Sequence, residues 1–183
     1  MKGFGFDLDG VLYDWHSSIY MYAKSMYNLK EESDIEFFRN MVDGKYTKNF
    51  IDTLMSYQPC YTNIVPNKKL VKLINTISKN FEIYYITSRW KNLEYVTSKW
   101  LEDYDFPQPY NLYMDEYKPD VIRKTFCKYY VDDMPKWGNK VLGITNFIYL
   151  KKRWHYQDNN LEEKSFLIIK NILELENKLD ILV

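Results

Sequence analysis

Residues 3–12 read Gly-Phe-Gly-Phe-Asp-Leu-Asp-Gly-Val-Leu. The aromatic run predicts a short buried strand over residues 4–6, because it is brief and leads directly into a turn signal. Asp7 and Asp9 then follow the carboxyl end of that strand, which is where open parallel sheets place their chemistry. Alternate residues of an extended segment point the same way, so both carboxylates can face one pocket.

The two carboxylates favour a cation. Close carboxylates repel one another unless a cation or a shared proton stabilises them, and Mg²⁺ is a hard ion that prefers oxygen ligands. Gly10 allows the sharp turn that follows. A calcium loop would need three spaced ligands before its glycine, and that pattern is absent. The tetrapeptide alone is equally compatible with a solvated turn, since Asp and Gly are common turn residues.

The composition sets limits on size and partners. The chain has 183 residues, 46% of them hydrophobic, which allows one core plus an insertion. It has 25 basic and 25 acidic residues, so no net field draws it to nucleic acid or to an anionic membrane. Cys60 and Cys127 lack metal or redox spacing and predict two reduced, buried thiols. With no signal peptide and no apolar run long enough to span a bilayer, we expect a cytoplasmic protein without a membrane partner.

Helical patterns follow the first strand. Apolar spacing predicts helices over residues 15–27, 34–41 and 47–57, the second opened by a capping box at Ser33. The resulting insertion, residues 15–66, is too long for an ordinary connection. Insertions of this kind above a sheet edge usually act as lids or binding loops, so we expect a small helical cap here.

Strands and helices then alternate, which predicts an α/β fold with a parallel sheet flanked by helices. We expect helices over residues 67–79, 92–101 and 119–127, strands over 81–86, 110–114 and 129–131, and one or two strands within 141–150. A closing amphipathic helix is expected from residue 159 to about 179. It would pack on the sheet, or serve a homodimer or another partner. The core domain would comprise residues 1–14 and 67–183.

Polar residues follow the other predicted strands. Thr87 and Ser88 could hold a phosphate oxygen, or simply cap the next helix, and the fork of Arg89 could bind a second anionic group. Lys118 is either a surface lysine or a fixed ammonium near the first carboxylate pair. Asp132 and Asp133 form either a turn or the second half of a Mg²⁺ site facing Asp7 and Asp9. Because all four features fall at predicted strand ends in one order, independent accident is a poor explanation.

In this order the four features resemble the motifs of the haloacid dehalogenase (HAD) superfamily of phosphotransferases, whose core is a HAD-like Rossmannoid sheet with a cap inserted after the first strand. The matching residues are Asp7-Leu8-Asp9-Gly10-Val11, Thr87, Lys118 and Asp132-Asp133. Residues 7–14 and the pair Thr87-Ser88 are most similar to the 5′(3′)-deoxyribonucleotidase group. That group also has an aromatic segment after its last core strand, which residues 151–156 with Trp154 resemble.

The resemblance implies phosphomonoester hydrolysis in two steps. Asp7 would attack phosphorus and become an aspartyl phosphate, while Asp9 would protonate the leaving alkoxide and later accept a proton from water. Mg²⁺ would be held by Asp7, the backbone carbonyl of Asp9 and the fourth-motif carboxylates, with Asp133 favoured over Asp132 as a direct ligand. The transferring oxygens would be held by Thr87, Ser88 and Lys118.

The implied substrate is a small phosphomonoester, most specifically a (deoxy)nucleoside monophosphate. Aromatic residues that could stack on a base are Trp15, Phe37, Phe38, Tyr46 and Tyr61, with Trp154 at the rim, although any of them could equally build the core of the cap. Alternatives left open are a polynucleotide 3′-phosphatase, a small-metabolite phosphatase and a catalytically silent binding protein on this fold. Residues 15–66 carry five basic and six acidic side chains, which is unlike a groove for nucleic acid.

Overall fold

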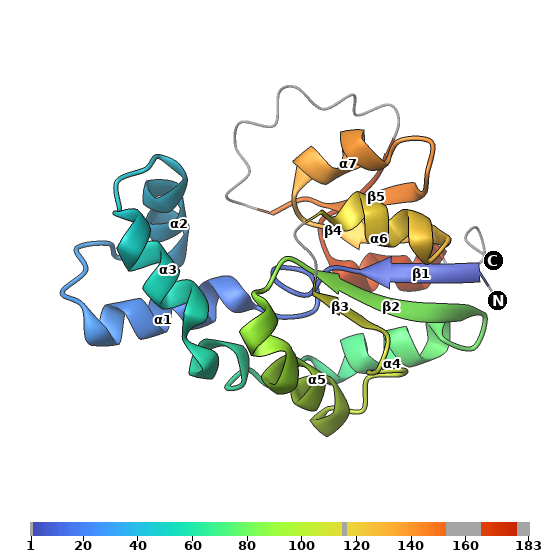
Figure 1. Cartoon of the computed structure of the whole chain (residues 1–183), viewed down its shortest axis with the longest axis horizontal. Coiled ribbons are helices and arrows are strands. Elements are labelled where there is room, and N and C mark those ends of the chain that lie inside the picture. The colour runs from blue at the N-terminus through green and yellow to red at the C-terminus, as the bar shows by residue number, and fades with distance from the viewer. Residues whose placement is uncertain (1, 115–116, 153–165, 179–183) are drawn as a thin grey trace.

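Six parallel strands form one sheet, with the first strand near its centre (Figure 1). The computed structural model describes residues 2–114, 117–152 and 166–178. The strand order is β3-β2-β1-β4-β5-β6, and every pairing is parallel. The strands are β1 (Lys2–Phe6), β2 (Phe81–Thr87), β3 (Leu112–Met114), β4 (Cys127–Asp132), β5 (Asn146–Leu150) and β6 (Leu167–Ile169). The predicted α/β fold with a parallel sheet is therefore confirmed.

The central strand β1 has two different faces. Phe4 and Phe6 pack on one side with their ring centroids 4.7 Å apart, in the larger of two hydrophobic clusters. The other side is bare, because it carries Gly3 and Gly5. A Cβ atom on Gly5 would lie only 2.9 Å from the ring of Tyr130, so this β4 side chain lies directly across the glycine.

Helices cover both faces of the sheet. One face is covered by α4 (Lys68–Ile77), α5 (Glu94–Asp103) and the 3-10 helix η4 (Ile172–Lys178), which contribute to the larger cluster. The other face is covered by α6 (Lys118–Lys124) and α7 (Pro135–Val141), around Ile122 and Trp137. A short 3-10 helix, η2 (Lys91–Leu93), leads into α5.

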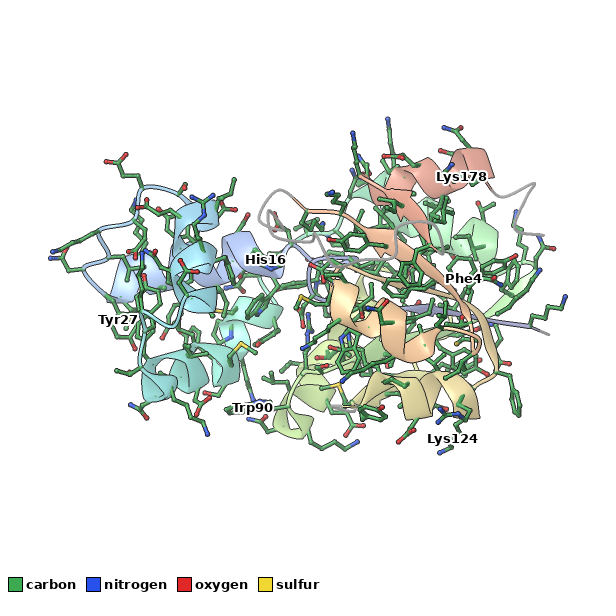
Figure 2. All side chains as sticks on the ribbon, turned by 90° about the horizontal axis from the view of Figure 1, so that it is seen from above. Phe4, His16, Tyr27, Trp90, Lys124 and Lys178 are labelled. Carbon is green, nitrogen blue, oxygen red and sulfur yellow. The ribbon has the colours of Figure 1, made fainter. Side chains whose placement is uncertain are left out.

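Three helices follow β1, as predicted, and lie to one side of the sheet (Figure 1). They are α1 (Trp15–Met26), α2 (Asp34–Val42) and α3 (Lys48–Ser56), followed by the 3-10 helix η1 (Gln58–Tyr61). Each α-helix begins at a side-chain cap: Asp14, Ser33 and Thr47 accept backbone N–H groups of the first turn. In Figure 2, Tyr27 marks this helical group and Phe4 marks the sheet. The exact domain boundary, residues 15–66, stays a prediction.

The end of the chain differs from expectation. The single closing helix is wrong where the structure describes it: Leu167–Ile169 form strand β6, and Ile172–Lys178 form a 3-10 helix. Three consecutive aliphatic residues, two of them β-branched, favour a strand beside β5. Glu174 then accepts the backbone N–H groups of Lys170 and Asn171 at 3.0 and 2.9 Å, which fixes the turn between them.

Cys60 and Cys127 are both buried and unpaired, which confirms the expectation of two free thiols. Burial raises the pKa of each thiol to about 11, so neither is a thiolate nucleophile at neutral pH. Among the described residues, none of the helices has the length and apolar character needed to cross a membrane.

Candidate active site

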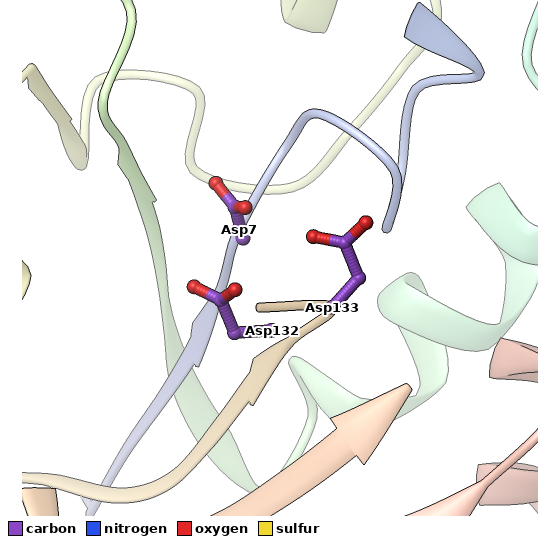
Figure 3. A group of neighbouring side chains, drawn as sticks. All are labelled: Asp7, Asp132 and Asp133. Carbon is purple, nitrogen blue, oxygen red and sulfur yellow. The ribbon is translucent and has the colours of Figure 1, made fainter. Parts of the chain in front are cut away.

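Three aspartates meet at the carboxyl ends of β1 and β4 (Figure 3). Asp7 directly follows β1, and its N–H donates to the carbonyl of Val131 at 2.9 Å. Asp132 ends β4, and Asp133 follows it. Parallel pairing of Phe6 with Val131 brings the two strand ends to the same level. One oxygen from each carboxylate lies within 4.8 Å of the others, and all three residues are buried.

Lys118 connects two of these carboxylates. It is the first residue of α6, and its Nζ lies 2.9 Å from Asp7 Oδ1 and 2.8 Å from Asp132 Oδ2. The Tyr130 hydroxyl donates to the same Asp132 oxygen at 2.6 Å, and the Met134 N–H donates to the other at 2.7 Å. Asp132 is therefore fully engaged by the protein, whereas no hydrogen bond to the Asp133 carboxylate is found among the described residues.

Burial and mutual repulsion raise the pKa values of two of these carboxylates. Burial raises the pKa of Asp7 to about 7, opposed by Lys118 and reinforced by Asp132 and Asp9. Burial, Asp132 and Asp7 raise the pKa of Asp133 well above its ordinary value, and Lys152 and Lys118 oppose this rise. The pKa of Lys118 is raised in turn by Asp132 and Asp7, although burial alone would lower it. A hard divalent cation would relieve this repulsion, and the all-oxygen ligand set fits Mg²⁺.

The loop after β1 holds the site together. The carbonyl of Leu8 accepts three successive N–H groups, from Val11, Leu12 and Tyr13, at 3.1, 2.9 and 2.8 Å. This tight turn places Gly10 at φ +81°, in the left-handed region that favours glycine. A Cβ atom at Gly10 would lie 2.2 Å from Asp133 Oδ2. The position therefore requires glycine for its conformation and for its contact with a site carboxylate.

Asp9 is held by Arg89. Arg89 Nη2 donates to Asp9 Oδ1 at 2.7 Å and Nε donates to Oδ2 at 2.9 Å, which is a two-point pair. The sequence predicts Arg89 as a ligand for a substrate anion. In the structure its guanidinium is instead engaged with a carboxylate of the protein itself.

Thr87 and Ser88, the hydroxyl residues after β2, occupy different environments. Thr87 ends β2 and is fully buried, and its hydroxyl accepts the N–H of Arg89 at 3.2 Å. Ser88 is exposed and lines the cleft above the aspartates. Of the two predicted phosphate-binding hydroxyls, the structure therefore presents Ser88 to the cleft and places Thr87 below it.

A cleft of about 180 Å³ opens over the aspartates. In Figure 2, His16 and Trp90 lie where the helical group meets the sheet. The charged and polar residues that line the cleft include Asp7, Asp9, Ser88, Lys118 and Asp133. The aromatic residues that line it include Trp15, His16, Tyr61, Trp90 and Trp137.

The aromatic candidates fall into three groups. Trp15 and Tyr61 line the cleft, as a stacking role requires. Phe37, Phe38 and Tyr46 pack in the core around the helices instead. Trp154 lies outside the described residues. Sequence reasoning missed Trp90 and Trp137. Trp90 follows Thr87 by three positions and Trp137 follows Asp133 by four, and this proximity to motif residues was the available signal.

Comparison with known proteins agrees with this geometry. No family model matches the chain. A Bacillus cereus protein described as "Putative nucleotidase" is 27% identical over 176 residues, which cover 86% of this chain and 90% of that protein. A hydrolase from Pseudomonas syringae superposes with a TM-score of 0.61 at 18% identity, over 100% of both chains. A Bacillus subtilis protein, YfnB, named as a HAD-hydrolase and bound to magnesium, superposes with a TM-score of 0.64 at 14% identity, over 98% of both chains.

These structures share the sheet and the helices that follow its first strand. The chain therefore has the HAD-like fold, with an acidic cluster at the carboxyl end of its first strand that could hold a metal ion.

Proposed function

We propose that the chain is a Mg²⁺-dependent phosphomonoester hydrolase that forms an aspartyl phosphate at Asp7. The observation that carries the proposal is the group of three carboxylates within 4.8 Å, with Lys118 bonded to two of them. The shared fold and the Bacillus cereus relative support it.

Asp7 and Asp133 would hold the metal directly. Both oxygens of Asp132 already accept protein donors, so we assign Asp132 to orienting Lys118 and the turn at Met134. The pKa of Asp133 is raised, and its carboxylate accepts no hydrogen bond from the described residues, so both of its oxygens could serve as metal ligands. When bound, Mg²⁺ would neutralise charge between the nucleophile and the phosphate and orient the two.

Asp7 is oriented for attack. Its Oδ1 accepts the N–H of Leu8 at 2.8 Å and lies 2.9 Å from Lys118 Nζ, which fixes the plane of the carboxylate. The other oxygen, Oδ2, attacks phosphorus, and the bond from phosphorus to the ester oxygen breaks. Lys118 and Ser88 donate to the oxygens that stay on phosphorus.

Asp9 moves the proton. It gives a proton to the departing alkoxide in the first step. In the second step it takes a proton from the water that attacks phosphorus, and phosphate leaves as Asp7 is regenerated. Asp9 lines the cleft and its side chain is 24% exposed, so it is accessible to both leaving group and water.

We propose (deoxy)nucleoside monophosphates as substrates. The support is the aromatic lining of the cleft by Trp15 and the more exposed Trp90, and the description of the Bacillus cereus relative. Aromatic rings stack on any base face, so this lining would accept several bases.

The test is phosphate release with Mg²⁺ from a panel of phosphomonoesters. The panel contains nucleoside and deoxynucleoside 5′- and 3′-monophosphates, sugar phosphates and a 3′-phosphorylated oligonucleotide. Asp7→Asn should abolish release and should abolish the phosphorylated Asp7 peptide in acid-quenched samples. The matched control is Asp120→Asn, because Asp120 is an exposed partner of Arg123. Release that survives in Asp7→Asn would overturn the mechanism, and preference for the oligonucleotide would overturn the substrate assignment.

A further inference from the structure

Arg89 is a buried guanidinium at the wall of the cleft. It lies two residues beyond β2, and its side chain is 1% exposed. Nε and Nη2 donate to Asp9, and Nη1 donates to the hydroxyl of Thr97 in α5 at 3.0 Å. Nε and Nη2 are therefore engaged by a carboxylate of the protein itself.

Two tyrosine rings contact the same guanidinium. Its carbon lies 4.9 Å from the ring centroid of Tyr13 and 4.6 Å from that of Tyr61. Such contacts are favourable for arginine, whose planar group stacks on aromatic faces. Both rings are themselves anchored, because the Tyr13 hydroxyl donates to the carbonyl of Cys60 at 2.5 Å and the Tyr61 hydroxyl donates to that of Met55 at 2.8 Å.

The two tyrosines come from the two crossings between the sheet and the helical group. Tyr13 precedes α1 by two residues, and Tyr61 ends η1 on the way back to α4. Arg89 therefore joins three separate parts of the chain at one point. Asp9 is the anion that Arg89 binds, and it accepts no other side-chain hydrogen bond among the described residues.

The pair fixes the orientation of Asp9 without occupying it fully. Two parallel N–H···O bonds set the plane of the carboxylate. Oδ1 accepts from both Nη2 and Nε, at 2.7 and 3.1 Å, whereas Oδ2 accepts from Nε alone at 2.9 Å, so Oδ2 keeps a lone pair for a proton in transit. The 24% exposure of the Asp9 side chain lies toward the cleft that it lines.

We propose that Arg89 is a positioning residue for proton transfer by Asp9, and that Tyr13 and Tyr61 hold Arg89 in place. The inference rests on the proposed function. In ester cleavage the bond from phosphorus to the leaving oxygen breaks as that oxygen takes the proton of Asp9. Arg89 acts only through the orientation of the carboxylate, so its contribution depends on how much the leaving group needs that proton.

The test compares two leaving groups in Arg89→Met. p-Nitrophenolate departs readily without a proton, whereas an alkoxide does not. We expect kcat/KM for an alkyl phosphate to fall about 10²-fold, the loss typical of a reacting group misplaced by 1 Å. For p-nitrophenyl phosphate we expect kcat/KM to fall less than about threefold, because its leaving group needs no proton. The later hydrolysis of the aspartyl phosphate does not enter this comparison, since kcat/KM covers only the steps through cleavage. Arg89→Lys keeps a cation but cannot form both bonds, and should show the same selectivity at about tenfold.

Two further variants exclude a merely structural role. Asp9→Asn should show the same dependence on the leaving group. The double variant Arg89→Met, Asp9→Asn should lose no more selectivity than Asp9→Asn alone, because coupled residues are non-additive. Arg123→Met is the matched control, since Arg123 is exposed and pairs with Asp120 at the surface.

The outcomes are distinct. Equal loss on both esters in Arg89→Met, or additive loss of selectivity in the double variant, overturns the inference while the wild-type chain remains an active phosphatase. A wild-type chain that hydrolyses neither ester overturns the proposed function itself. If Arg89→Met does not fold, the selectivity of Arg89→Lys decides, and uniform loss there overturns the inference.

Discussion

Gly10→Ala should lower kcat/KM by about 10²-fold by displacing Asp133, while leaving the fold intact. The added methyl group would lie 2.2 Å from Asp133 Oδ2 and 2.8 Å from its carboxyl carbon. Real Cβ atoms essentially never approach another heavy atom within 3.0 Å, so the carboxylate has to move by roughly 0.8 Å or more. A displacement of that size at a reacting centre costs on the order of 10²-fold in rate.

The conformational part of the cost can be separated by a control. Gly10 has φ +81°, and a left-handed conformation costs a non-glycine residue about 1–2 kcal/mol. Gly143 has φ +77°, but a Cβ atom there would meet nothing within 4 Å. Gly143→Ala should therefore lose a similar free energy of unfolding, about 1–2 kcal/mol, and keep its activity.

The assay measures kcat/KM for phosphate release and Mg²⁺ affinity in both variants, with urea unfolding in parallel. We expect the variants to match in stability and to differ by about 10²-fold in kcat/KM. If Gly10→Ala keeps activity and Mg²⁺ affinity within about twofold of Gly143→Ala, the position of Asp133 is not what the site depends on, and its assignment as a ligand is refuted.

Three other perturbations follow from the site. Lys118→Met should lower activity at least about 10²-fold and the free energy of unfolding by about 3–5 kcal/mol, because it leaves two buried carboxylates uncompensated; urea unfolding near the wild-type value would contradict this. In EDTA, stability should fall as pH rises from about 4 to about 7: the pKa of Asp7 is raised from 3.8 to about 7, so the folded chain binds this proton more tightly than the unfolded chain does. Thermal unfolding measured across pH should show that stability falls less steeply with pH when Mg²⁺ is present or in Asp7→Asn. An unchanged slope under both conditions would contradict the assignment of this pH dependence to Asp7. Trp90→Ala should raise KM while changing stability by less than about 0.5 kcal/mol, since Trp90 lines the cleft and is 39% exposed; an unchanged KM would remove Trp90 from the substrate site.

The strands that carry the site could be predicted from sequence because each is a short apolar run that ends at a polar residue. This holds for β1, β2 and β4, and it was sufficient to place Asp7, Thr87 and Asp132 at one edge of the sheet. Lys118 was predicted as the basic residue that follows the strand over residues 110–114, and it is the first residue of α6. Local patterns therefore predicted the order of the motifs and the class of fold.

Short elements escaped prediction. Helix α7 has seven residues, too few for apolar periodicity to appear, and only Pro135 at its start marked it. Strand β6 has three residues. They lie in a stretch that mixes apolar and charged side chains, so their aliphatic run is compatible with a helix as well as with a strand. Pairing with β5 makes this segment a strand, and local sequence patterns do not reveal which strand it will pair with.

The partner of Arg89 could not be predicted for a different reason. An arginine fork at a strand end binds a carboxylate or a phosphate equally well, so its residue type does not identify the anion. Asp9 lies 80 residues away in sequence, Tyr13 lies in the same loop as Asp9, and Tyr61 comes from a further segment. Only the assembled structure shows that the anion belongs to the protein.

The contact between Gly5 and Tyr130 bears on how freely this sequence can vary. Any side chain at position 5 would press on the Tyr130 ring from 2.9 Å, and the hydroxyl of that ring donates to Asp132. Substitution of Gly5 should therefore impair the site through Tyr130 and Asp132, although Gly5 is not among the residues that line the cleft over the aspartates. A directed-evolution library that protects only the residues around the cleft would lose function through this strand, and a designer who fills the bare face of β1 to gain stability should expect to lose turnover instead.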